Sequence, residues 1–208
     1  TQSTAQPPHS AASGAPPRRP LGVYVHFPWC LKKCPYCDFL SVAAARDAIP
    51  HQAYADAVLR DLAARLPLLG ANYRLETVFF GGGTPSLWAT EELGRVLQGV
   101  LDAFADHRAP EVEVTAECNP TSLDLEKARA LADVGVNRLS LGVQGLDAER
   151  LAFLGRLHDP SGGIDAARAA LRSQMPRVSV DFIFGVAGQT PEQVANEART
   201  LANLGTTH

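Results

Sequence analysis

Three cysteines fall within eight residues near the start of the chain, and this spacing constrains the protein more than any other feature. Cys30, Cys34 and Cys37 are separated by three and then by two residues. Gaps this short let the chain turn back on itself, so the three thiolates can reach one metal centre and leave a coordination position open. Such a set suits an iron–sulfur cluster that binds a further group at its fourth iron.

Three other interpretations of the cysteines stay open on spacing alone. A tetrahedral zinc ion could bind the three thiolates together with His26 or a water molecule. Cys34 and Cys37 alone have the spacing of a redox-active pair. The cysteines could also be structural residues without a ligand.

Composition restricts the class of protein. The chain has 208 residues, of which 46% are hydrophobic and 20% charged, as in an ordinary globular domain. Its net charge of −3 gives no indication of binding to nucleic acid or to an anionic membrane. No segment approaches the roughly 18 apolar residues of an integral membrane span. Four cysteines, three of them clustered, favour a reducing compartment, so we expect a cytoplasmic protein.

Strand-like and helix-like segments alternate after a leader. Residues 1–19 are rich in Ala, Pro and Ser and are predicted to be a disordered leader. Apolar segments near 21–27, 75–80, 111–117, 138–144 and 177–184 predict strands. Helical patterns lie near 52–67, 89–105, 123–134, 147–154, 163–174 and 191–204, with Thr90 and Thr190 as candidate N-caps. This alternation predicts an α/β fold with a parallel sheet, and residues 205–208 would enter a sixth strand.

One face of several predicted strands is polar, although both faces of a parallel strand are usually covered. If these faces converge, the interior is a polar cavity, and its carboxylates need partners because unpaired buried charge is costly. The alternative is an open sheet whose polar face is exposed. The polar positions are Tyr24 and His26; Glu113, Thr115 and Glu117; Ser140, Gly142 and Gln144; and Ser179 and Asp181.

A glycine triplet, Gly81 to Gly83, follows the second predicted strand and precedes Thr84 and Pro85. Glycines at such a turn allow the backbone to approach a ligand closely. With the cysteine spacing, this turn resembles the radical S-adenosylmethionine (SAM) superfamily. Further segments resemble its oxygen-independent coproporphyrinogen III dehydrogenase group over about residues 21–208: 26–39, 81–87, 117–120, 135–144, 154–158 and 188–190.

The resemblance implies a fold, a ligand set and cofactors. The fold would be a partial (β/α)6 radical SAM barrel over residues 20–208, truncated before or within its sixth unit and lacking a further C-terminal region. Cys30, Cys34 and Cys37 would bind a [4Fe–4S] cluster, whereas Cys118 would be a small apolar residue. The positions that match SAM contacts of the family are Tyr24, Tyr36, Gly82, Gly83, Thr84, Glu117, Gln144, Arg156 and Asp181.

Two branches of the group fit the sequence to different degrees. True coproporphyrinogen dehydrogenases have a fourth cysteine two positions after the third, where this chain has Phe39. The segment from Trp29 to Phe39 resembles the HemW branch of heme chaperones, which hand heme to acceptor proteins. This branch implies heme as cargo, and heme-accepting proteins, an electron donor and a second copy of the chain in a homodimer as partners. It leaves enzymatic turnover undecided. The alternative is an oxygen-independent coproporphyrinogen III oxidase of tetrapyrrole synthesis.

Overall fold

The computed structural model describes residues 18–70 and 72–208. Residues 1–17 of the expected leader lie outside the described part. The first strand, β1, spans Arg19–Phe27, and Arg18 donates a hydrogen bond from Nη1 to the Asp106 carbonyl. Arg19, the last residue of the expected leader, therefore belongs to β1 instead.

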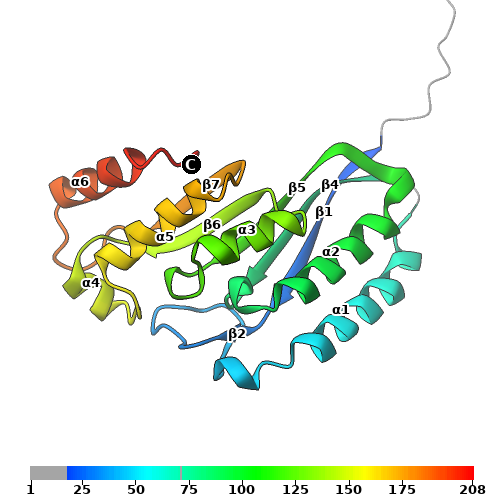
Figure 1. Cartoon of the computed structure of the whole chain (residues 1–208), viewed down its shortest axis with the longest axis horizontal. Coiled ribbons are helices and arrows are strands. Elements are labelled where there is room, and N and C mark those ends of the chain that lie inside the picture. Colours follow the sequence, from blue (N-terminus) through cyan, green and yellow to red (C-terminus); the bar gives the residue numbers. More distant parts are fainter. Residues whose placement is uncertain (1–17, 71) are drawn as a thin grey trace, which may run out of the picture.

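Five parallel strands form the main sheet in the order β1-β4-β5-β6-β7 (Figure 1). Within this sheet, each strand pairs with the strand of the same sheet that follows it in the sequence. This is the arrangement of a barrel wall, and it confirms the predicted α/β fold. A second, two-stranded parallel sheet pairs β2 (Trp29–Cys30) with β3 (Val42–Ala43). The remaining strands are β4 (Tyr73–Gly82), β5 (Arg108–Cys118), β6 (Arg138–Gln144) and β7 (Arg177–Phe182).

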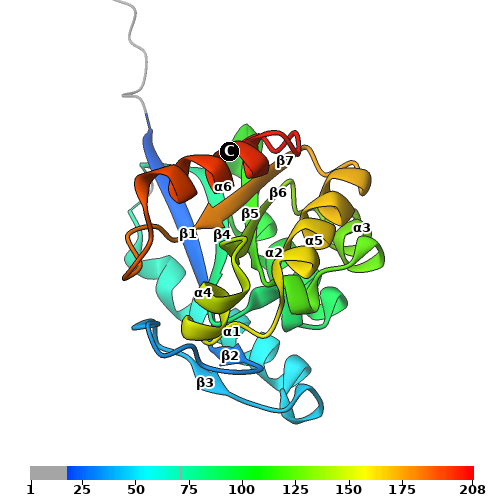
Figure 2. The same cartoon turned by 90° about the vertical axis from the view of Figure 1, so that its left-hand side faces the viewer.

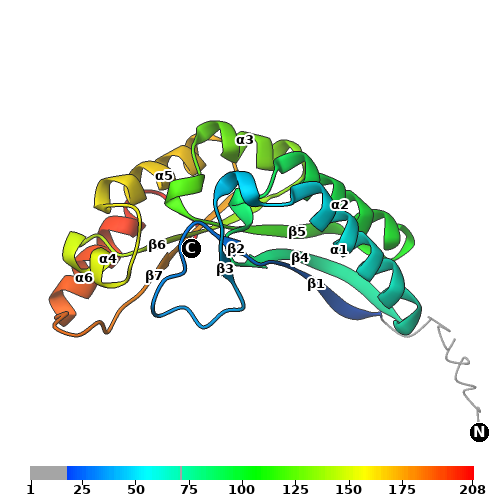
Figure 3. The same cartoon turned by 90° about the horizontal axis from the view of Figure 1, so that it is seen from below.

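The helices cover one face of the curved sheet. Figure 3 shows α1, α2, α3 and α5 side by side along that face, and Figure 2 shows α6 beside the β7 end of the sheet. The opposite face carries the polar strand positions. No helix in the described ranges is long and apolar enough to cross a bilayer. The helices are α1 (His51–Arg65), α2 (Thr90–Ala103), α3 (Leu125–Asp133), α4 (Ala148–Phe153), α5 (Pro160–Arg172) and α6 (Pro191–Ala202).

The two proposed helix caps have different outcomes. Thr190 caps α6 in a reciprocal capping box with Gln193, as predicted. Thr90 does not cap α2, because Ala89 occupies the N-cap position. The Thr90 hydroxyl instead accepts a hydrogen bond of 2.7 Å from Lys127 Nζ, so the side chain links two helices rather than ending one.

The last residues continue along the free side of β7. The amide of Val180 donates to the His208 carbonyl at 3.1 Å, and the amide of Thr207 donates to the Val178 carbonyl at 2.9 Å. Thr207 and His208 therefore lie beside β7, where the expected sixth strand would pair, but residues 205–208 are not assigned to a strand.

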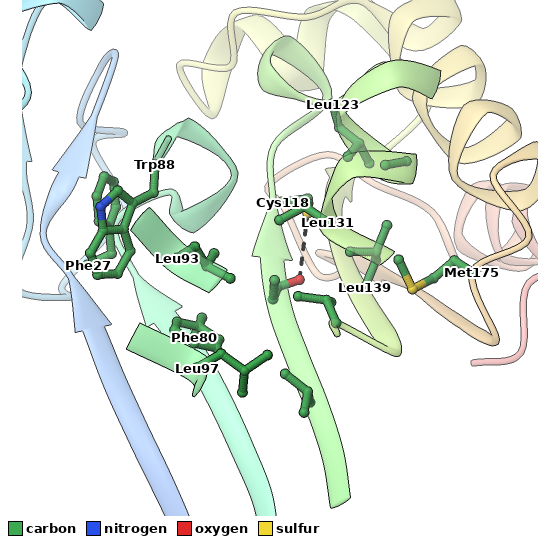
Figure 4. Close-up of a cluster of buried hydrophobic side chains, with 14 of the residues drawn as sticks. Phe27, Phe80, Trp88, Leu93, Leu97, Cys118, Leu123, Leu131, Leu139 and Met175 are labelled. Atoms are coloured by element: carbon green, nitrogen blue, oxygen red, sulfur yellow. Dashed lines mark hydrogen bonds between the residues drawn. The ribbon is translucent and has the colours of Figure 1, made fainter. Parts of the chain in front are cut away.

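The core between the sheet and the helices is built around Trp88. This side chain is fully buried, and its ring stacks on Phe27 with the ring centroids 5.0 Å apart (Figure 4). Cys118 lies in the same hydrophobic cluster, where burial raises the pKa of its thiol to about 12. Cys118 thus behaves as the small apolar residue that the sequence predicts.

Replacing Trp88 with Ala removes the largest fully buried side chain and leaves a cavity beside Phe27. We expect Trp88→Ala to lower the free energy of unfolding by about 3–5 kcal/mol, as measured by urea denaturation. Leu68→Ala is the control, because Leu68 is 83% exposed and its loss should change stability by less than about 0.5 kcal/mol. Equal effects of the two substitutions would contradict this description of the core.

Candidate functional site

A cavity of about 180 Å³ lies where the carboxyl ends of the strands meet the cysteine loop. Cavities that enclose a whole ligand usually measure roughly 300–1,000 Å³, so a ligand of nucleoside size would extend beyond this one. All of the predicted site residues except Tyr24 line it. They are Cys30, Cys34, Cys37, Tyr36, Gly82, Gly83, Thr84, Glu117, Gln144, Arg156 and Asp181.

The cysteine loop, residues 30–41, is held at both of its ends. The Ala44 amide donates to the Cys30 carbonyl at 2.9 Å. Within the loop, the Cys37 amide donates to the Cys34 carbonyl at 3.1 Å. The Lys33 ammonium donates to the carbonyls of Phe39 and Ser41 at 3.3 and 3.4 Å. A single lysine therefore ties the first half of the loop to its second half.

The three thiols surround the cavity without converging on one point. In the described part of the chain, no three Cys, His, Asp or Glu side chains are grouped closely enough to bind a single metal ion. His26 is also engaged elsewhere, since Nε2 donates to the Leu40 carbonyl at 2.7 Å and Nδ1 accepts from the Tyr24 hydroxyl at 3.1 Å. The zinc site completed by His26 is thus not formed. Each thiolate of a four-iron cluster binds a different iron, so thiols spread around a cavity fit such a cluster.

The glycine turn approaches the segment that precedes the cysteine loop too closely for any larger residue. Gly82 has a φ of +113°, and a Cβ there would lie 2.6 Å from the His26 ring. A Cβ on Gly83 would lie 2.6 Å from the Trp29 carbonyl oxygen, a backbone atom that cannot rotate away. Close packing against the segment that leads into Cys30 therefore requires glycine at this turn, and the predicted approach to a ligand stays a prediction.

Two carboxylates face the cavity from neighbouring parts of the sheet. Glu117 Oε2 accepts a hydrogen bond of 3.0 Å from the Gly82 amide. Burial raises the pKa of the Glu117 carboxyl, the Gly82 amide opposes this rise, and nearby Asp181 adds to it. Asp181 accepts hydrogen bonds of 3.0 and 2.9 Å from the Ser140 hydroxyl. A ligand that brings a hydroxyl or an amine would stabilise the ionised Glu117 and lower this pKa again.

Gln144 ends β6 in an unusual backbone conformation. Its φ of +68° lies in the left-handed region, which costs a non-glycine residue about 1–3 kcal/mol. The Gln144 carbonyl accepts a hydrogen bond of 3.1 Å from the Ile183 amide, and this bond holds the strained residue at the cavity. The sequence carries no signal for this strain, although strand alternation places Gln144 on the correct face.

Arg156 reaches the cavity from the segment after α4, where strand alternation could not predict it. Its Nη2 donates to the Gly142 carbonyl at 2.7 Å, and its Nη1 donates to the Tyr36 hydroxyl at 3.4 Å. Arg156 Nε is buried without a hydrogen-bond partner in the described residues. His158 fixes the segment because its Nε2 donates to the Val143 carbonyl at 2.9 Å. Arg156 thus retains a buried donor for a further acceptor.

Convergence of the polar strand faces is confirmed only at their carboxyl ends. Glu113 lies farther back on β5 and pairs with Arg177 at 3.3 Å and Arg138 at 3.8 Å. Tyr24 also lies outside the cavity lining, is 57% exposed and stacks on Phe79. The cavity further includes residues that were not predicted as site residues, namely Lys32, Lys33, Phe39, Ser41, Cys118, Asn119, Ser140 and Gly142.

The different surroundings of the four cysteines predict different reactivity. In the metal-free protein, we expect iodoacetamide to modify the partly exposed Cys30, Cys34 and Cys37 and to spare Cys118. The raised pKa of the buried Cys118 thiol leaves almost no thiolate near neutral pH. Mass spectrometry before and after unfolding measures the extent of modification of each cysteine. Modification of Cys118 in the folded protein to the same extent as the other three cysteines would contradict the prediction.

Comparisons with known proteins agree with this geometry. The model of the radical SAM superfamily matches residues 24–201. The heme chaperone HemW of Haemophilus influenzae is 34% identical over 194 residues, which cover 91% of this chain and 49% of that protein. The mitochondrial radical S-adenosyl methionine domain-containing protein 1 of Bos taurus is 40% identical over 92% of this chain and 42% of its own length.

A solved structure has the same fold. The radical SAM enzyme coproporphyrinogen III oxidase (HemN) of Escherichia coli superposes with a TM-score of 0.74 and 27% identity, over 91% of this chain and 43% of the enzyme. The chain thus spans about half the length of the curated relatives that it matches. The matched family model, the relatives and the arrangement of the cysteine loop over the strand ends show that this chain belongs to the radical SAM superfamily.

Proposed function

We propose that the cavity binds a [4Fe–4S] cluster and SAM, and that the protein is a heme chaperone of the HemW type. The observation that carries the first part is the meeting of three thiols, a glycine turn and polar strand ends in one cavity. When bound, the cluster and SAM supply one-electron chemistry, while the protein binds and orients them. The superfamily as a whole implies both cofactors, and the present donor set fits them.

The residues around the cavity suit the cluster and different parts of SAM. Cys30, Cys34 and Cys37 provide the thiolates for three irons of the cluster. Glu117 and Asp181 provide acceptors for hydroxyl or amino groups. The buried, unpartnered Nε of Arg156 provides a donor for a carboxylate. Tyr24 lies outside the cavity lining, so its predicted contact requires a ligand that extends beyond the cavity.

Heme is proposed as cargo because several curated relatives at about 34% identity are named heme chaperone HemW. Phe39 supports this branch, since the dehydrogenase branch is expected to have cysteine at that position. The partners would be heme-accepting proteins and an electron donor in the cytoplasm. The homodimer stays a prediction. The second candidate, a coproporphyrinogen III oxidase, is supported by the structural likeness to HemN.

The polar strand ends predict how SAM binding responds to mutation. Glu117→Ala removes a charge-assisted hydrogen bond, worth roughly 1.5–3 kcal/mol, so the dissociation constant for SAM should rise about ten- to a hundredfold. Calorimetric titration of the anaerobically reconstituted protein measures this dissociation constant. Iron and sulfide content should stay at about four each per chain, because Glu117 is not a cluster ligand.

Two further variants make this test specific. Thr115→Val is the matched control, since Thr115 is buried on the same strand but does not line the cavity, and it should leave SAM affinity unchanged. Cys30→Ala should lose the cluster. An unaltered SAM affinity after simultaneous replacement of Glu117, Gln144 and Asp181 by Ala would show that the strand ends do not bind SAM.

The heme proposal is tested on the full-length protein. We expect the reconstituted protein to bind heme, seen as a Soret absorption band, to transfer it to an apo-hemoprotein, and to leave coproporphyrinogen III unconsumed. Consumption of coproporphyrinogen III without heme binding would favour the oxidase instead. The absorbance of heme and the mass of the porphyrin product are the two readouts.

A further inference from the structure

Two side chains donate hydrogen bonds to the sulfur atoms of the cysteine loop. The Thr84 hydroxyl lies 3.5 Å from Cys30 Sγ, and Arg156 Nη1 lies 3.7 Å from Cys34 Sγ. The two donors come from different parts of the chain, one from the glycine turn after β4 and one from the segment after α4. Each therefore links a separate element of the fold to a separate thiol.

Thr84 has little freedom to turn its hydroxyl elsewhere. Thr84 is buried, with 7% of its surface exposed. Its amide donates to the Trp29 carbonyl at 2.9 Å, and its carbonyl accepts from the Leu87 amide at 2.9 Å. The backbone of the turn is thus bound on both sides, and Cys30 is the acceptor that the hydroxyl finds. An interior hydroxyl left without a partner would be costly, which favours this contact.

Arg156 is similarly fixed. The bond from its Nη2 to the Gly142 carbonyl orients the guanidinium, and the adjacent His158 clamps the segment to β6. The positive charge of Arg156 therefore stays beside Cys34, where it acts on the sulfur both as a donor and as a cation.

We propose that Thr84 and Arg156 raise the reduction potential of the cluster by hydrogen bonding to its thiolate sulfurs. This inference rests on the cluster of the proposed function. Reduction by one electron from an external donor makes the cluster and its thiolates more negative, so donors and cations close to sulfur stabilise the reduced state more than the oxidised state. Both residues were predicted to contact SAM, whereas the structure assigns them a role that is exerted without SAM.

The test is a redox titration of the reconstituted protein in the absence of SAM, with the reduced cluster followed by electron paramagnetic resonance. Thr84→Val keeps the shape and removes the hydroxyl. We expect it to lower the equilibrium constant for reduction about three- to tenfold, which is ~28–59 mV for a one-electron couple. Thr84→Ser keeps the hydroxyl and should restore the potential. Arg156→Gln should lower the potential by at least as much as Thr84→Val, because it also removes a charge.

Thr115→Val is the matched control and should leave the potential unchanged, because the Thr115 hydroxyl bonds Glu113 and Arg138 away from the cysteines. Unshifted potentials in cluster-loaded Thr84→Val and Arg156→Gln would overturn the inference, and so would an equal downward shift in Thr84→Ser and Thr84→Val.

A measurement on the unmodified protein covers the case in which Thr84→Val does not hold a cluster. The iron–thiolate stretching bands in resonance Raman spectra should shift when the protein is exchanged into D2O, because the exchangeable protons of Thr84 and Arg156 are hydrogen-bonded to the thiolate sulfurs. Bands that do not move would overturn the inference. If the unmodified protein binds no four-iron cluster, both the proposed function and this inference fail. If it binds the cluster but the potentials and bands do not shift, only this inference fails.

Discussion

Backbone hydrogen bonds between the glycine turn and the residues before Cys30 hold the candidate site together. The Gly83 amide donates to the Phe27 carbonyl at 2.6 Å, and the Thr84 amide donates to the Trp29 carbonyl at 2.9 Å. They extend the β1–β4 pairing beyond the ends of both strands. The first cysteine is consequently fixed relative to the sheet before any ligand binds, and the close approach explains why a side chain at Gly83 would collide with the backbone.

The carboxylates on the polar face of the sheet have different partners at the two ends of the strands. Toward the amino ends of the strands, Glu113 is neutralised by two arginines of β6 and β7. Toward the carboxyl ends, Glu117 and Asp181 make no ion pair within the described ranges and have only an amide and a hydroxyl as donors. A partly buried carboxylate without a cation is costly, which supports the proposal that a ligand with hydroxyl or amino groups binds at this cavity.

Much of the fold and most of the site could be predicted because both follow local rules. Strand alternation placed Glu117, Gln144 and Asp181 on one face of a parallel sheet, where all three line the cavity, and the chain order of the elements matches the prediction. Side-chain partners could not be predicted, since they depend on contacts between distant segments. Glu113 was expected on the same polar face as Glu117, but it pairs with arginines instead. Thr90 was expected to cap a helix, but it binds Lys127 instead. Arg156 was identified by resemblance alone, because no periodic pattern marks the segment after α4.

The most direct measurement of the central claim compares SAM binding with and without the cluster. If the cysteine loop and the strand ends form one cavity, calorimetric titration should show SAM binding strongly to the reconstituted protein and at least tenfold more weakly to the Cys30→Ala protein, which lacks the cluster but retains Glu117, Gln144 and Asp181. The fold of the variant is checked by its urea denaturation curve. Equal SAM affinity with and without the cluster would contradict the single cavity and would place SAM at a site independent of the three cysteines.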